Sequence, residues 1–232
     1  MRPISGGLCS VCGERILSPH AFADPATPVL CGLCHRSAPP YVKAAAYGSY
    51  EAGLRELIHL LKYDGIRPAG NVLGRMLADA IVTLEPGFGS DPVLVVPVPL
   101  HRRKSRQRRF NQSELIARIA LDARRNPNLQ LATGVLERRR ETESQIGLSR
   151  HQRRENIRGA FAVAKPEKVE GRVVLLVDDV FTTGTTVSEC AKVLLRSGAS
   201  KVWVATVART LKSEVQQIQP RTDEMPVMAA SA

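Results

Sequence analysis

The feature that most constrains this chain is an apolar run that ends in two carboxylates and a threonine-rich turn. Val173 to Val177 is continuously apolar, which is typical of a strand buried on both faces of a parallel sheet. Asp178 and Asp179 follow, and the small residues 182–186 lead into a stretch with helical periodicity. The pattern therefore predicts a strand, an acidic edge, an anion-sized loop and a helix.

A turn built from threonine and glycine suits a phosphate group. Gly184 lets backbone N–H groups converge, and the dipole of the following helix adds positive charge. The hydroxyls of Thr182, Thr183, Thr185 and Thr186 are further donors. The carboxylates upstream would repel a phosphate, so we expect them to accept hydrogen bonds from sugar hydroxyls or to hold a metal ion through water. A phosphate beside vicinal hydroxyls describes a ribose 5-phosphate.

Two other interpretations fit this stretch less well. The acidic pair could simply cap the next helix at an ordinary strand end, which would not require four threonines around one glycine. A nucleotide-triphosphate P-loop requires the motif G-x-x-x-x-G-K-[ST], and no glycine of this chain is followed by lysine.

The charge of the chain indicates polyanionic partners. Its 33 lysines and arginines outnumber 22 acidic residues, giving a net charge of +11, while aromatic residues make up only 4%. Nucleotide phosphates, pyrophosphate and nucleic acid all fit this charge, although few aromatics are available to stack on bases. Without an apolar run of the ~20 residues needed for a membrane helix, or an apolar N-terminal segment, we expect a cytoplasmic protein with reduced thiols and no membrane span.

Residues 1–43 form a separate unit by composition, because they contain two C-x2-C pairs and little periodicity. Cys9, Cys12, Cys31 and Cys34 have the spacing of a tetrahedral, structural zinc site. Free thiols and two disulfides are the alternatives, and His20 and His35 offer substitute ligands. The fifth cysteine, Cys190, lies on the apolar face of a predicted helix and is expected in the core.

Two arginine-rich segments remain. In residues 101–110, which follow the predicted strand Val93 to Val98, six of ten residues are cationic, so we expect a mobile loop unless an anion neutralises it. This loop leaves the carboxyl end of a strand, where parallel sheets bind ligands. Residues 138–156 form the second segment, for which a basic surface helix is the alternative. For Lys62, in the break between two predicted helices, the alternatives are a site or only solvent, and solvent is the default expectation.

These motifs together resemble known families. Val174 to Thr186 resembles the signature by which type I phosphoribosyltransferases bind 5-phosphoribosyl 1-pyrophosphate (PRPP). The resemblance implies that Asp178 and Asp179 bind the ribose 2- and 3-hydroxyls and that residues 182–186 wrap the 5-phosphate. The segment Pro97-Val98-Pro99 is similar to the pyrophosphate loop of amidophosphoribosyltransferases.

The segment 108–112, Arg-Arg-Phe-Asn-Gln, narrows the resemblance to the ComF family, which is associated with DNA uptake in competent bacteria and typically has Arg-Gly-Phe-Asn-Gln here. Arg109 replaces that glycine and would be strained if φ is positive. The second arginine-rich segment resembles a segment of the ComF family. The counterpart of that segment in amidophosphoribosyltransferases is a mobile loop that closes over PRPP. The residues carried over to it are Arg140, Thr142, Gln145, Arg153 and Asn156, with Arg153 and Arg154 not distinguished.

The resemblance implies an α/β protein with a type I phosphoribosyltransferase fold, in which helices flank a parallel sheet behind an N-terminal zinc ribbon. Residues 1–43 would form the ribbon, 44–211 the phosphoribosyltransferase-like domain and 212–232 a tail of low order. The PRPP-binding residues would be Pro97, Val98, Pro99, Arg108, Asn111, Gln112, Arg140, Gln145, Asp178, Asp179, Thr182, Thr183, Gly184, Thr185 and Thr186.

The implied reaction transfers a phosphoribosyl group to a nitrogen nucleophile and releases pyrophosphate. Asp178, Asp179 and Arg153 would serve catalysis, with Mg²⁺ bridging pyrophosphate and ribose oxygens. The alternative is a PRPP-sensing protein without catalysis that binds single-stranded DNA and DNA-uptake proteins. The acceptor pocket is not marked in the sequence.

Overall fold

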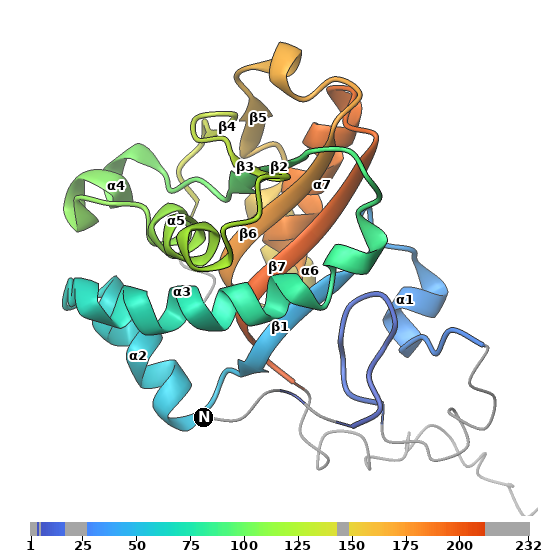
Figure 1. Ribbon diagram of the computed structural model, residues 1–232, viewed down its shortest axis with the longest axis horizontal. Coiled ribbons are helices and arrows are strands. Elements are labelled where there is room, and N and C mark those ends of the chain that lie inside the picture. Colours follow the sequence, from blue (N-terminus) through green and yellow to red (C-terminus); the bar gives the residue numbers. More distant parts are fainter. Residues whose placement is uncertain (1–3, 5, 17–26, 143–148, 212–232) are drawn as a thin grey trace, which may run out of the picture.

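A five-stranded parallel sheet forms the centre of the computed structural model, which describes residues 4, 6–16, 27–142 and 149–211 (Figure 1). The strand order is β1 (Ala44–Ser49), β7 (Lys201–Arg209), β6 (Val173–Phe181), β2 (Val93–Pro97) and β3 (Leu129–Leu131). All neighbouring pairs are parallel. A separate antiparallel pair consists of β4 (Leu136–Arg138) and β5 (Phe161–Val163). The predicted parallel α/β fold is confirmed.

Helices cover both faces of this sheet (Figure 1). The apolar sides of α2 (Ala52–Lys62), α3 (Arg67–Val82) and α5 (Gln112–Arg124) pack on one face, in a cluster with strand residues such as Leu175 and Val177. On the other face, α7 (Thr185–Arg196) packs with Val174 and Leu176. The short elements are α1 (Gly32–Arg36), η2 (Glu85–Gly87), α4 (Arg102–Arg108), α6 (Arg150–Ile157) and η3 (Pro166–Lys168). No helix in the described ranges is both long and apolar enough to cross a membrane.

The central strand β6 is longer than its apolar run. The sequence predicted that the strand ends at Val177, whereas hydrogen-bonded pairing with β7 continues through Asp178 to Phe181, which lies opposite Arg209. The prediction was wrong at this end because a neighbouring strand supplies backbone partners that the side-chain pattern does not reveal. Both carboxylates therefore stand on a fixed strand instead of a loop.

The first arginine-rich segment is a helix, so the predicted loop is also wrong. The side chain of His101 accepts a hydrogen bond from the backbone N–H of Arg103 and caps α4. Arginine and lysine are good helix formers, and five of the seven helix residues are of these types. Arg109 ends the helix with φ at 63°, in the left-handed region. The ComF-type glycine would suit this conformation, so the expected strain at Arg109 is present.

Replacing Arg109 with glycine is expected to raise the free energy of unfolding by about 0.5–1 kcal/mol, because a Cβ at positive φ costs about 1–2 kcal/mol and the greater backbone entropy of glycine in the unfolded chain offsets part of the gain. Chemical denaturation measures the change. As a control, Arg106→Gly inside α4 should instead lower stability by up to about 1 kcal/mol. Equal effects of the two substitutions would contradict the strain.

The four-cysteine unit packs against the sheet. An antiparallel bridge joins Leu8 and Arg15, and the backbone N–H of Ala44 donates to the carbonyl of Val11. Cys9 and Cys12 are buried in the same apolar cluster as the inner face of α7, where Cys190 is fully buried as predicted. The unit thus shares its core with the sheet. Gln145 and the predicted tail at 212–232 lie outside the described residues.

Candidate functional site

The two carboxylates of β6 are held from both flanking helices. Ser113, at the start of α5, donates its hydroxyl to Asp178 Oδ1 at 3.0 Å, and the backbone N–H of Asp179 donates to the same oxygen at 2.9 Å. Lys62, the last residue of α2, donates to Asp179 Oδ1 at 2.8 Å. The second oxygen of Asp179, Oδ2, is buried and has no hydrogen-bond partner within the described part of the chain. One acceptor of the pair is therefore left for a ligand.

Burial and neighbouring charges shift the pKa values of Asp178 and of Lys62. Burial and the neighbouring charge of Asp179 raise the pKa of Asp178 to about 7, although Lys62 and the hydrogen bonds to Asp178 oppose this rise. Burial works to lower the pKa of Lys62, but the charge of Asp179 and the hydrogen bond to it raise that pKa above its usual value. Lys62 is therefore the cation that allows two adjacent carboxylates to stand on one strand.

Lys62 and Ser113 are the site residues that sequence reasoning missed. Lys62 was expected to face solvent, which is wrong, since its side chain is only 16% exposed. No pattern marked Ser113, although it directly follows the Phe-Asn-Gln motif. Both contacts are made across more than 60 residues of sequence, so only the folded arrangement of α2, α5 and β6 reveals them.

The threonine loop begins α7 through a left-handed glycine. Gly184 has φ at 74° and takes the N-cap position without a side-chain cap, which leaves N–H groups of the first turn to other partners. A Cβ on Gly184 would meet the ring of Phe181 at 2.6 Å, so packing as well as φ requires glycine. The hydroxyls of Thr183 and Thr185 lie 2.8 Å apart. This helix N-terminus is suited to bind an anion.

The Pro-Val-Pro segment lies beside the acidic pair. Pro97 is in register with Val177, and the backbone N–H of Val98 donates to the carbonyl of Val177 at 2.8 Å. Asn111 caps α5 by accepting from the N–H of Ser113, and its amide donates to the carbonyl of Val98 at 3.0 Å. Asn111 thus joins two of the motifs found in the sequence.

Cations converge next to this segment. Burial and the positive charges of Arg138 and Arg108 lower the pKa of Lys104, with a smaller contribution from Lys62. Arg108 donates to the side chain of the buried Gln112 at 3.1 Å. Burial also lowers the pKa of Arg138, which hydrogen-bonds to the buried Thr142. Positive charges close enough to affect one another's pKa favour binding of a multivalent anion.

In the second arginine-rich segment, Arg138 ends β4 and residues 150–157 form α6, while residues 143–148 lie outside the described part of the chain. Arg140 is tied to the end of α6. The guanidinium of Arg140 donates to the carbonyls of Asn156 and Arg158 at 2.8 and 2.9 Å. The side chain of Arg140 therefore contacts the backbone of Asn156. Between the two arginines that the sequence did not distinguish, Arg154 lines the cavity described next, together with the threonine loop.

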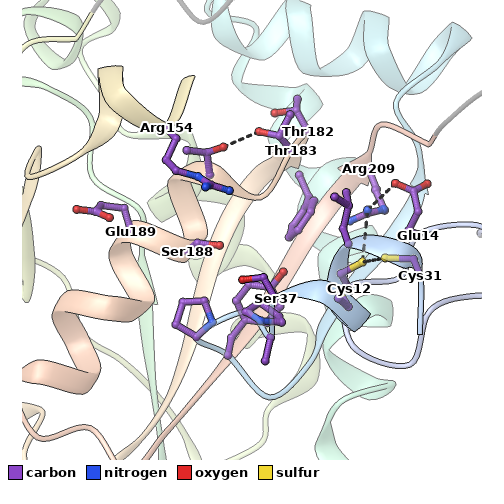
Figure 2. A pocket seen from close by; sticks show the side chains of 18 of the residues that line it. Cys12, Glu14, Cys31, Ser37, Arg154, Thr182, Thr183, Ser188, Glu189 and Arg209 are labelled. Carbon is purple, nitrogen blue, oxygen red and sulfur yellow. Dashed lines mark hydrogen bonds and ion pairs between the residues drawn. The ribbon is translucent and has the colours of Figure 1, made fainter. Parts of the chain in front are cut away.

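Figure 2 shows this cavity of about 630 Å³, which opens between the four-cysteine unit, α6 and α7. Thr182, Thr183 and Arg154 form one wall, with Ser188 and Glu189 of α7 beside them (Figure 2). The cysteine pair Cys12 and Cys31 lies on the opposite wall (Figure 2). The remaining lining residues include apolar groups such as Tyr41, Ile157 and Phe181. Asp178 and Asp179 do not line it.

Comparisons with known proteins agree with this geometry. The family model "Phosphoribosyl transferase domain" matches residues 113–223, which include β6, the threonine loop and β7. DNA utilization protein YhgH of Escherichia coli (strain K12) is 35% identical over 213 residues, covering 88% of this chain and 91% of the relative. The chain belongs to the ComF/YhgH family. Competence protein F of Haemophilus influenzae is 30% identical over 88% of this chain and 90% of its own length.

A more distant member of the same family is competence protein ComFC of Bacillus subtilis, which is 23% identical over 90% of this chain and 81% of its own length. These matches extend over most of each protein. The chain is thus a ComF-family protein along nearly its full sequence, with a phosphoribosyl transferase domain.

The four cysteines of this ComF-family chain fit a metal ion. Their sulfur atoms all lie within 4.8 Å of one another, and those of Cys12 and Cys31 are 3.6 Å apart. A zinc ion with four bonds of about 2.3 Å places its sulfur ligands about 3.8 Å apart. The described cysteines are free thiols, so the disulfide alternative is not supported. The exposed His35 is not part of the cluster.

A buried arginine links this cluster to the threonine loop. Arg209, at the end of β7, is 4% exposed and donates to Glu14 Oε2 at 3.1 Å and to the sulfur of Cys12 at 3.8 Å. Its guanidinium lies 4.4 Å from the centre of the Phe181 ring. The same ring packs against Gly184. The four-cysteine unit and the candidate phosphate loop are therefore connected by continuous packing.

Proposed function

We propose that this ComF-family protein binds PRPP and transfers its phosphoribosyl group to a nitrogen nucleophile, releasing pyrophosphate. The observation that carries the proposal is the arrangement around β6. Asp178 and Asp179, with one buried acceptor left over, are followed in the chain by the uncapped N-terminus of α7. Asp178 is close enough to Arg138 for its charge to affect the pKa of that arginine, and Arg138 and Arg108 act in the same way on Lys104. A ribose diol, a 5-phosphate and a pyrophosphate match these three parts in order.

Each part has a defined task in the reaction. Asp178 and Asp179 accept hydrogen bonds from the ribose hydroxyls, while residues 182–186 hold the 5-phosphate at the start of α7. The C1–oxygen bond to pyrophosphate breaks, a C1–nitrogen bond forms, and the nucleophile loses a proton. Lys104, Arg108 and Arg138 stabilise the negative charge that develops on the leaving group. Arg153 or Arg154 of α6 would approach from the second segment. Mg²⁺, when bound with PRPP, would neutralise its phosphate oxygens.

We also propose zinc as the ion of the cysteine cluster, in a structural role, and 1–43, 44–211 and 212–232 as the parts of the chain. Four thiolate ligands leave no open position for water, which is typical of structural zinc. Such a site needs reduced cysteines and thus favours the cytoplasm.

Calorimetry with Mg²⁺ and PRPP tests the binding step, and radiolabelled PRPP with a panel of nucleobases and amines tests the transfer. Asp178→Asn should weaken PRPP binding roughly 10- to 150-fold, since a hydrogen bond to a charged group contributes about 1.5–3 kcal/mol. The exposed Asp122→Asn is the matched control. If the wild-type protein binds PRPP but yields no pyrophosphate with any acceptor, the transfer is wrong and the binding stands.

The affinity for PRPP is expected to rise with pH through about 7, because Asp178 must be ionised to accept a hydroxyl and its pKa lies near that value. Below the pKa, affinity should fall by up to about tenfold per pH unit. PRPP itself also titrates, so the profile of Asp178→Asn provides the reference. Identical pH profiles of wild type and Asp178→Asn would contradict the assignment.

A trough between α6 and α7 supports a second candidate, binding of single-stranded DNA without catalysis. The trough adjoins the cavity of Figure 2 and shares Arg154, Glu189 and Lys192 with it. Its other cations are Arg158 and Arg196. Four cations against two glutamates suit a phosphate backbone. Fluorescence anisotropy with a labelled single strand should then show strong salt dependence, and Arg158→Ala with Arg196→Ala should reduce its slope by about 2.

A further inference from the structure

Lys62 makes a buried ion pair with the acidic pair from an element that the proposed PRPP motifs do not include. Its side chain is 16% exposed and that of Asp179 is 6% exposed, with 2.8 Å between Nζ and Oδ1. The helix that carries it, α2, ends at Lys62, so the ammonium group projects from a helix C-terminus. The favourable dipole there further stabilises the charged form.

The contact with Lys62 gives the two oxygens of Asp179 different surroundings. Lys62 occupies Oδ1, whereas Oδ2 is buried without a partner among the described residues. Ser113 occupies Oδ1 of Asp178 in a similar way. A carboxylate held by one oxygen cannot rotate freely, so the direction of its second oxygen is fixed by the helix that supplies the donor.

We propose that Lys62 is a positioning residue for sugar specificity: by holding Oδ1 of Asp179, it directs Oδ2 toward one ribose hydroxyl and so makes the protein reject the corresponding deoxyribose. This inference rests on the proposed function of the acidic pair. A site with a buried acceptor discriminates against a ligand that lacks the matching hydroxyl, because the acceptor is then left unsatisfied. Without Lys62, Asp179 can rotate, and the penalty for the missing hydroxyl decreases.

The experiment compares three probes by calorimetry: ribose 5-phosphate, 2-deoxyribose 5-phosphate and 3-deoxyribose 5-phosphate. Inorganic phosphate carries no sugar hydroxyl and therefore reports on anion binding without the acidic pair. The wild-type protein should bind ribose 5-phosphate at least about tenfold more tightly than one or both deoxy sugars. Lys62→Met should reduce one of these ratios to within about threefold and leave phosphate affinity unchanged. The matched control is Lys201→Met. Lys201 is exposed and is the first residue of β7.

A purely structural role would weaken all probes alike. The inference would therefore be overturned if Lys62→Met left both affinity ratios, of ribose 5-phosphate to each deoxy sugar, unchanged. It would also be overturned if phosphate affinity fell as much as the affinity for ribose 5-phosphate. If Lys62→Met does not fold, Lys62→Gln keeps a polar side chain at the position, but its amide is uncharged and one bond shorter than the lysine that reaches Oδ1 at 2.8 Å. It is therefore expected to lose the same discrimination, and retained ratios there would also overturn the inference. If the wild-type protein binds neither ribose 5-phosphate nor PRPP, the proposed function itself is wrong, which is a distinguishable result.

Discussion

Replacing Arg209 with methionine is expected to lower the free energy of unfolding by about 3–5 kcal/mol, because the change removes one member of a buried ion pair. Glu14 is only 7% exposed and accepts from Arg209 at 3.1 Å. Methionine restores much of the volume but provides neither this contact nor the stacking on Phe181. Denaturation in urea measures the loss.

Two further variants separate charge from packing. The double variant Glu14→Gln with Arg209→Met removes both charges and should recover a large part of the lost stability, since the buried carboxylate that Arg209 neutralised is also gone. Arg118→Met breaks an exposed pair with Glu114 on α5 and should cost no more than about 0.5 kcal/mol. If Arg209→Met is as mild as Arg118→Met, the ion pair does not join the cysteine unit to the sheet.

The parts of the fold that were predicted from sequence are those with a local pattern. Val173 to Val177, the threonine loop and the apolar face of α7 follow one another within 25 residues, and a continuous apolar run or a helical period records burial directly. The cysteine cluster was predictable because ligand spacing is part of the sequence. In these cases neighbouring residues carry the whole signal.

The contacts that were not predicted are those between distant residues. Lys62 meets Asp179 across 117 positions, and Arg209 meets Glu14 across 195. A lysine at a helix end and an arginine at a strand end are ordinary surface residues in any local pattern. Only the folded arrangement of α2, β6 and β7 brings each to its carboxylate. Strand order also extends β6 beyond Val177, since Thr206 and Ala208 of β7 supply the pairing.

These contacts also change how the acidic pair should be tested. Asp179→Asn would leave the buried ammonium of Lys62 without its counter-ion, so lost PRPP binding in that variant would mix ligand contacts with stability. Asp178 is held mainly by Ser113 and a backbone N–H, which an asparagine can still accept. Asp178→Asn is for this reason the cleaner variant.

Removal of the zinc ion proposed for the cysteine cluster is expected to have the largest effect, because binding of structural zinc contributes about 10–16 kcal/mol in small zinc-binding units. Metal analysis should find one zinc ion per chain. After chelation, the four-cysteine unit should lose its structure, and the loss should extend to the sheet. Ala44 on β1 then loses the carbonyl of Val11, and Arg209 loses its contact with Cys12.

Hydrogen exchange measures how far this loss extends. Amides of β1 and of the last residues of β7 should exchange faster after chelation, whereas those of β2, which pairs with β6 and β3, should not change. Cys12→Ser should reproduce the effect and release zinc. Cys190→Ala, which changes a buried cysteine on the inner face of α7, should retain the zinc. Because Arg209 packs on Phe181 and Phe181 on Gly184, phosphate affinity should fall together with the metal. Unchanged exchange at β1 and β7 would mean that the cysteine unit folds independently of the sheet.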